Sequence, residues 1–165
     1  MFTVLQVVTL MLVAFAMVPA VAHALEFPGK RRLPQDAYLT VQRIYYPGFT
    51  IAGLVEGFSL IAALALVMLT PRGSTAFALS LTALILLLTM HAVYWIVTAP
   101  VNKIWLKGQQ LSRAGTAFFR MKTDSGRVRE SEWTALRDRW EYSHLVRAVL
   151  VTIALALLAC ALAIS

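Results

Sequence analysis

The sequence predicts an all-α integral membrane protein, a four-helix bundle with both termini on the non-cytoplasmic side. Of its 165 residues, 59% are hydrophobic and the mean hydropathy is +0.72, whereas soluble domains are about 45–50% apolar. Four apolar stretches are each long enough to cross a bilayer, which takes about 20 residues. The predicted spans of this single domain, residues 1–165, are residues 2–25, 48–69, 76–98 and 145–164.

The first two predicted spans are separated by a polar loop. Residues 2–25 have no basic start and exceed the length of a signal-peptide core, so we expect a retained helix. Residues 26–47 form a polar loop with a short helix starting near Pro34. The second span follows at once, and its Gly53-xxx-Gly57 spacing favours close approach of another helix.

The third span ends in a polar stretch that carries the most informative residues. His91, Trp95, Thr98 and Asn102 follow helical spacing and are expected to share one face. Pro100 is expected to end or kink the helix, because it lacks a backbone N–H and clashes with the preceding turn.

The loop at residues 99–144 is expected to have two parts. The first, through Phe119, lies in the membrane interface with Trp105, Leu106 and Leu111 facing lipid. The second is an amphipathic helix that starts near Ser131 and runs unbroken into the fourth span.

The basic residues set the expected orientation and environment. They concentrate in the loops 26–47 and 99–144, whereas the turn between spans two and three holds only Arg72. Lys and Arg mark cytoplasmic loops, so both long loops are predicted to face the cytoplasm of a bacterial-type inner (plasma) membrane. The net charge of +7 is therefore assigned to anionic lipid headgroups and not to nucleic acid. Association with further copies of the chain is left open.

Each predicted span places at least one ionisable side chain in the cytoplasmic half of the bundle. Such groups are costly in a membrane and usually face a partner or a cavity. Imidazole and carboxylate together suit iron, copper, manganese or zinc, and we predict one or two such ions. The predicted metal ligands are His23, Glu26, Glu56, His91 and His144.

Other polar and aromatic side chains lie near the same level. Arg147 and Asn102 are candidates to act on a substrate, and Trp95, Trp140 and Tyr45 to wall its cavity. The simpler alternatives are a metal-free ion pair of Glu56 with His91 or Arg147, backbone hydrogen bonds for each His, and core packing for each Trp.

Two short patterns resemble a known family. Pro100-Val-Asn102 after His91, and Trp140-xxx-His144-xx-Arg147, are similar to a bacterial four-helix membrane family classified as a domain of unknown function (number 1772) and grouped with the anthrone oxygenases. The resemblance implies functional roles for Asn102, Trp140, His144 and Arg147. It also implies oxidation of polycyclic aromatic substrates with molecular oxygen.

Three functions remain open from the sequence. The first is a metal-dependent membrane oxidoreductase or oxygenase acting on an apolar, aromatic or quinone-like molecule. The second is a haem protein for electron transfer with two His ligands, which the buried carboxylates disfavour. The third is a non-enzymatic membrane subunit whose Glu and His side chains relay protons.

Overall fold

A computed structural model of the chain describes residues 2–45, 48–105 and 130–165. The elements in chain order are α1 (Phe2–Lys30), α2 (Gln35–Gln42), the 3-10 turn η1 (Arg43–Tyr45), α3 (Gly48–Leu69), α4 (Thr75–Val93), the π-helical turn η2 (Tyr94–Thr98), α5 (Ala99–Trp105) and α7 (Glu130–Ala163).

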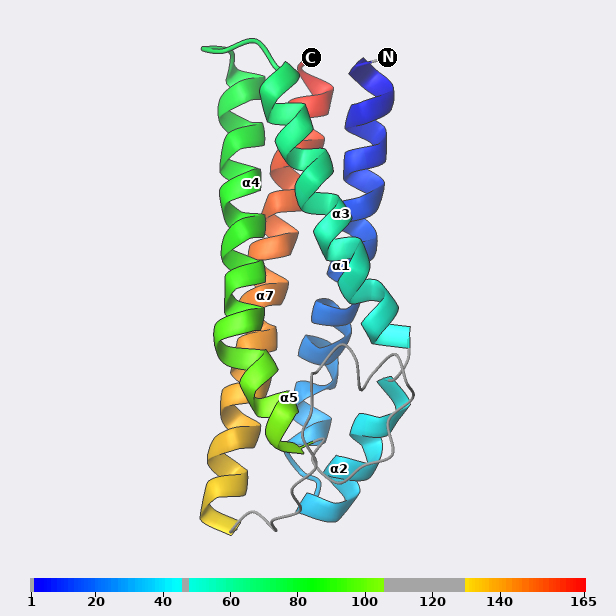
Figure 1. Cartoon of the computed structure of the whole chain (residues 1–165), viewed down its shortest axis with the longest axis vertical. Coiled ribbons are helices and arrows are strands. Elements are labelled where there is room, and N and C mark those ends of the chain that lie inside the picture. The colour runs from blue at the N-terminus through cyan, green and yellow to red at the C-terminus, as the bar shows by residue number, and fades with distance from the viewer. Residues whose placement is uncertain (1, 46–47, 106–129) are drawn as a thin grey trace.

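Four helical segments are long and apolar enough to cross a membrane: Phe2–Lys30, Gly48–Leu69, Thr75–Trp105 and Glu132–Ala163. This confirms the prediction of an all-helical protein with four spans. The two termini lie at the same end of the bundle, and α2 lies at the other (Figure 1). Which end faces the cytoplasm stays a prediction.

The outward faces of the helices are apolar, as a lipid environment requires. Leu25, Met68 and Ile96 are 77%, 69% and 68% exposed. Between the helices the buried core is rich in small residues such as Ala63, Ala83 and Ala154, which let helix backbones approach closely.

A second, aromatic core closes the α2 end of the bundle. Tyr38, Trp105, Trp133 and Trp140 pack together with Val101. The expectation that Trp105 faces lipid is therefore wrong: its side chain is 9% exposed, and its ring centroid lies 5.5 Å from that of Tyr38. Leu106 and Leu111 lie outside the described residues.

The third spanning segment continues past Pro100. The helix shifts to π-type bonding over Tyr94–Thr98 and resumes as α5. Pro100 cannot bond the Ile96 carbonyl, and the Arg139 guanidinium donates to that oxygen over 3.5 Å. Figure 1 shows α5 turning in under the bundle, which brings Asn102 and Trp105 inside.

Two of the helices extend beyond the predicted spans. α1 runs to Lys30, five residues beyond the predicted span, and includes Pro28. α7 begins at Glu130 and is continuous through the fourth span, as its helical spacing indicated. The long α7 therefore carries both aromatic-core residues and the polar residues of the site.

Candidate active site

A cavity lies between the helices in the half of the bundle nearest α2. Nine of the ten residues singled out from the sequence line it: His23, Tyr45, Glu56, His91, Trp95, Asn102, Trp140, His144 and Arg147. Glu26 does not. The other lining residues were not among the predicted site residues; they are Pro19, Gln42, Phe49, Thr50, Gly53 and Tyr94.

Glu56 is the central anion of the cavity wall. It is buried on α3, and its carboxylate forms an ion pair with Arg147 of α7. Its second oxygen, Oε2, lies 3.6 Å from His91 Nδ1 on α4. Glu56 thus contacts both partners named as metal-free alternatives, and three helices meet at one carboxylate.

His91 has its tautomer set by two neighbours. The Trp95 indole N–H donates to His91 Nε2 over 2.9 Å. An indole nitrogen can only donate, so Nε2 accepts and the ring proton sits on Nδ1, facing Glu56. The imidazole side chain is 32% exposed and reaches the cavity. The Glu56 carboxylate faces the Nδ1–H at 3.6 Å and can stabilise an imidazolium, which leaves Nε2 as the base, provided that the Trp95 indole moves aside.

The other two imidazoles carry the opposite tautomer. Lys30 Nζ lies 3.2 Å from His23 Nδ1, and Arg147 Nη1 lies 3.3 Å from His144 Nδ1. Ammonium and guanidinium groups have no acceptor, so each Nδ1 accepts and each Nε2 carries the proton. The two rings are neighbours, with centroids 4.3 Å apart.

The contacts of His23 and His144 with cations disfavour these two imidazoles as ligands of a resident metal ion. A ligating imidazole normally donates its other N–H to a carboxylate or carbonyl, whereas here the other nitrogens of His23 and His144 accept from cations. In the part of the chain that the structure describes, no group of three or more His, Cys, Asp or Glu side chains could hold a metal ion. Metal or haem binding therefore stays a prediction.

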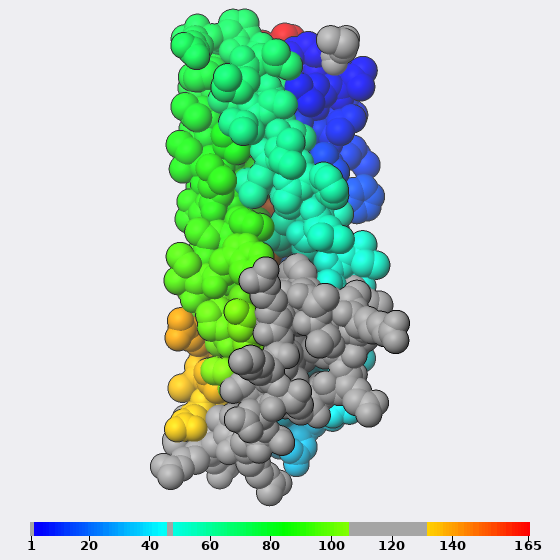
Figure 2. Space-filling model, in the orientation of Figure 1, coloured from blue at the N-terminus to red at the C-terminus, as the bar shows by residue number. Residues whose placement is uncertain are grey.

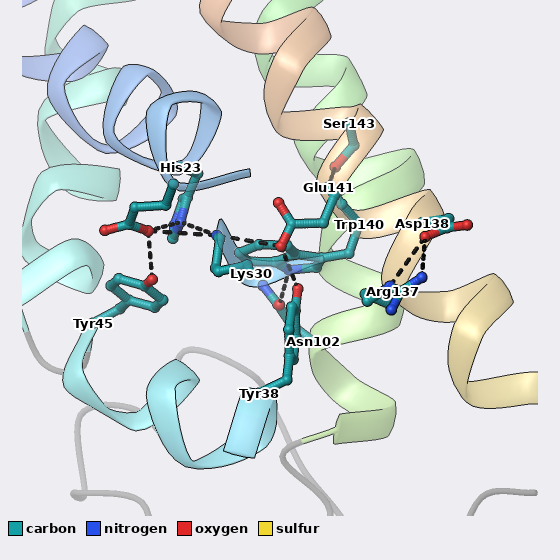
Figure 3. Close-up of polar contacts among 11 residues, drawn as sticks. His23, Lys30, Tyr38, Tyr45, Asn102, Arg137, Asp138, Trp140, Glu141 and Ser143 are labelled. Carbon is teal, nitrogen blue, oxygen red and sulfur yellow. Dashed lines mark hydrogen bonds and ion pairs between the residues drawn. The ribbon is translucent and has the colours of Figure 1, made fainter. Parts of the chain in front are cut away.

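Lys30 organises a second group of polar side chains beside His23 (Figure 3). It is 4% exposed and lies 3.5 Å from Glu26 Oε2 and 3.3 Å from Glu141 Oε1. The predicted spans place Lys30 in a loop, but it follows Glu26 by four residues and His23 by seven. That helical spacing is the signal that places it on the same face.

Two phenols complete this group from the α2 side. Tyr38 donates to Glu141 over 2.6 Å, and Tyr45 donates to Glu26 over 2.5 Å. Burial, followed by the negative charge of the Glu141 carboxylate, raises the pKa of Tyr38 well above its ordinary value. Burial, followed by the hydrogen bond to Glu26, raises the pKa of Tyr45 in the same way. Both phenols therefore remain donors and hold α2 and η1 against the bundle.

Asn102 lies in the cavity wall, in the helix that follows the π-helical turn. Its Oδ1 accepts from Trp140 Nε1 over 2.7 Å, which joins α5 to α7. Thr98, expected on the same face, instead contacts Ser143 Oγ at 2.8 Å and is fully buried. Of the four residues expected to share one face, His91, Trp95 and Asn102 therefore line the cavity, whereas Thr98 packs against α7.

The fold and site define a multi-pass helical membrane protein with acid–base side chains around a cavity in one half of the bundle. The chain matches the family model described as Anthrone oxygenase over residues 41–157, and it belongs to the anthrone oxygenase family. The matched range begins after His23, Glu26 and Lys30, so α1 adds its cavity residues from outside it. No curated protein and no solved structure matches the chain.

Proposed function

We propose that the chain is a membrane oxygenase for an apolar aromatic ketone or phenol of the anthrone type. The observation that carries this function is the Glu56–His91 pair on the cavity wall, with the His91 proton directed at Glu56. Such a pair removes a proton from a weak acid. The family description supplies the substrate class.

Proton removal is the chemistry that an anthrone needs before it meets oxygen. The ring carbon opposite its carbonyl bears two weakly acidic hydrogens, and loss of one gives an anion delocalised onto the oxygen. This electron-rich anion can reduce dioxygen. Overall, one anthrone and one dioxygen give one anthraquinone and one water: both ring hydrogens leave in the water, and the second oxygen atom forms the new carbonyl.

The cavity residues divide this work by position. Once the Trp95 indole moves aside, His91 Nε2 takes the proton and Glu56 stabilises the resulting imidazolium. Arg147 holds the Glu56 carboxylate in position through their ion pair. The Nε2–H groups of His23 and His144 are suited to stabilise negative charge that develops on the substrate oxygen.

An apolar substrate is expected to arrive through the lipid. α3 and α4 lie side by side near the termini and diverge toward the α2 end (Figures 1 and 2). Thr50 and Gly53 of α3, and Trp95 beyond α4, line the cavity at that level, and Trp95 is 48% exposed. We assign entry to the side of the cavity where Thr50, Gly53 and Trp95 lie, in the cytoplasmic half of a bacterial-type inner membrane.

A metal-dependent form of the same activity makes a different prediction. It requires about one or two equivalents of iron, copper, manganese or zinc in the purified protein and loss of that metal in His91→Ala. Elemental analysis decides between the two forms. The tautomers of His23 and His144 favour the form in which protein side chains alone move the proton.

Oxygen uptake with anthrone tests the proposed function. Purified protein in detergent should consume one dioxygen per anthrone, and His91→Ala should slow the reaction about 10²–10⁴-fold, the usual contribution of a positioned base. Met68→Ala, which alters only an exposed residue on the lipid-facing side, should retain the rate. Uptake that is equally fast in His91→Ala would reject the assigned base.

A further inference from the structure

Buried hydrogen-bond donors without partners gather at the cavity. Among the described residues, five buried side-chain nitrogen or oxygen atoms have no hydrogen-bond partner. Three belong to cavity residues: Gln42 Nε2, His91 Nδ1 and Arg147 Nε. All three are donors, and His91 Nδ1 at least faces Glu56, although 3.6 Å is too long for a hydrogen bond.

Of these three residues, Gln42 is the one whose burial the contacts within the protein explain least. It is the last residue of α2 and is 8% exposed. Its amide nitrogen offers two hydrogens, and neither the ion pairs nor the aromatic core uses them. An unpaired buried donor is unfavourable, so this position makes sense where a ligand supplies the missing acceptor.

We propose that Gln42 is a specificity-determining residue that donates to the carbonyl or phenolate oxygen of the substrate. This assignment rests on the proposed function and gives the bound molecule a direction. α2 lies across the bundle from α4 (Figure 1). Gln42 and His91 line the same cavity from these two elements, so we place the oxygen of a flat three-ring ketone at Gln42 and its opposite edge, where the acidic hydrogens are, at His91.

The charge of the wall agrees with an oxygen acceptor at this end. Two imidazoles that line the cavity each contact a cation: His23 contacts Lys30, and His144 contacts Arg147. Each imidazole is left with a donor N–H. Gln42 adds an uncharged donor to the same cavity. The polar groups of the cavity near α1 and α2 are therefore mainly hydrogen-bond donors, which can bind an acceptor.

Two probe molecules of nearly the same shape can show whether Gln42 binds a substrate oxygen or only packs in the structure. Anthrone and 9,10-dihydroanthracene share the three-ring frame, but only anthrone carries an oxygen. Their binding can be followed without oxygen in detergent by quenching of tryptophan fluorescence, since Trp95 and Trp140 line the cavity. The wild-type protein should bind anthrone at least about tenfold more tightly, as expected for one satisfied buried donor.

Gln42→Leu should lower the affinity for anthrone about tenfold and leave that for dihydroanthracene unchanged within about twofold. Gln35→Leu, at the other end of α2 and away from the cavity, should change neither. Equal weakening of both probes in Gln42→Leu, or equal affinities in the wild type, would overturn the role of Gln42. If the wild type binds neither probe, the proposed function itself fails along with this assignment.

Discussion

Each imidazole in the cavity has one ring nitrogen already engaged by a neighbouring side chain. Trp95 donates to His91, Lys30 contacts His23 and Arg147 contacts His144. Because of these contacts, the proton of the His91 ring points toward Glu56, whereas the rings of His23 and His144 each keep an Nε2–H group that can donate to a ligand. The three histidines therefore have different roles because each ring has a different hydrogen-bond partner.

The Glu56–Arg147 ion pair should dominate the stability of this half of the bundle. Both side chains are nearly fully buried, 7% and 3% exposed. Arg147→Met leaves a buried carboxylate without its partner, and the cost expected is about 3–5 kcal/mol. Thermal unfolding in detergent should show the loss, and Glu56→Gln/Arg147→Met should recover much of it. A double variant as unstable as Arg147→Met would contradict the pairing.

The two phenols of the α2 side should resist ionisation. The pKa of both Tyr38 and Tyr45 is raised, so the folded state holds these protons more tightly than the unfolded state does. The resulting stabilisation is complete below the unfolded value of about 10 and is lost as pH rises through the folded values. The 295 nm absorbance of the folded protein at pH 11 should therefore be the same in Tyr38→Phe. A lower absorbance in Tyr38→Phe than in the wild type would contradict the raised pKa of Tyr38.

Some residues of the site could be found from the sequence and others could not. His23, Glu56, His91 and His144 stand out because an ionisable group in an apolar span needs a reason. Gln42 lies in a polar loop, where an amide carries no such signal. Its position depends on how the loop folds back onto the bundle, and that is a tertiary property.

At the level of the element, the π-helical turn at Tyr94–Thr98 determines what α5 presents to the bundle. Pro100 signals an irregularity, and the sequence predicts an end or a kink there. A π turn instead absorbs the missing N–H, while the Arg139 contact serves the Ile96 carbonyl. The sequence pattern around Pro100 indicates where the helix is irregular, but packing against α7 determines that the irregularity is a π-helical turn.

Removing one residue from this turn should rotate α5 by about 100°, the angle per residue of an α-helix. Deletion of Val97 is then expected to turn position 102 out of the core and to break the Asn102–Trp140 hydrogen bond. The measurement is maleimide labelling of Asn102→Cys with Cys160 replaced by Ala. Labelling should be slow in the parent, where the side chain is 8% exposed, and fast after the deletion. Equally slow labelling in both would show that the turn does not set the rotation.

At the scale of the whole molecule, the bundle separates an apolar half from a polar one. The apolar core of small residues lies toward the termini, and the ionisable side chains and aromatic core lie toward α2. The number of spans and this layering could be predicted from hydropathy and from the depth of each charged residue. Hydropathy alone misses the polar group around Lys30, because it places Lys30 in a loop, and only the helical spacing of His23, Glu26 and Lys30 indicates that they share a face.

The distribution of Lys and Arg predicts that the polar half faces the cytoplasm. A fluorescent protein fused after Ser165 should then be dark in bacterial cells, and alkaline phosphatase fused there should be active. The same reporters placed after Gln35, near the start of α2, should give the reverse. A bright fusion after Ser165 would place the site on the other side of the membrane.

The central claim is that the Glu56–His91 pair removes a proton from the substrate before oxygen reacts. Deuterium exchange at the acidic ring carbon of anthrone, followed by NMR in D₂O without oxygen, measures that step alone. The wild-type protein should accelerate exchange, and both His91→Ala and Glu56→Gln should lose most of the acceleration, about 10²-fold or more. Exchange as fast in both variants as in the wild type would contradict the account.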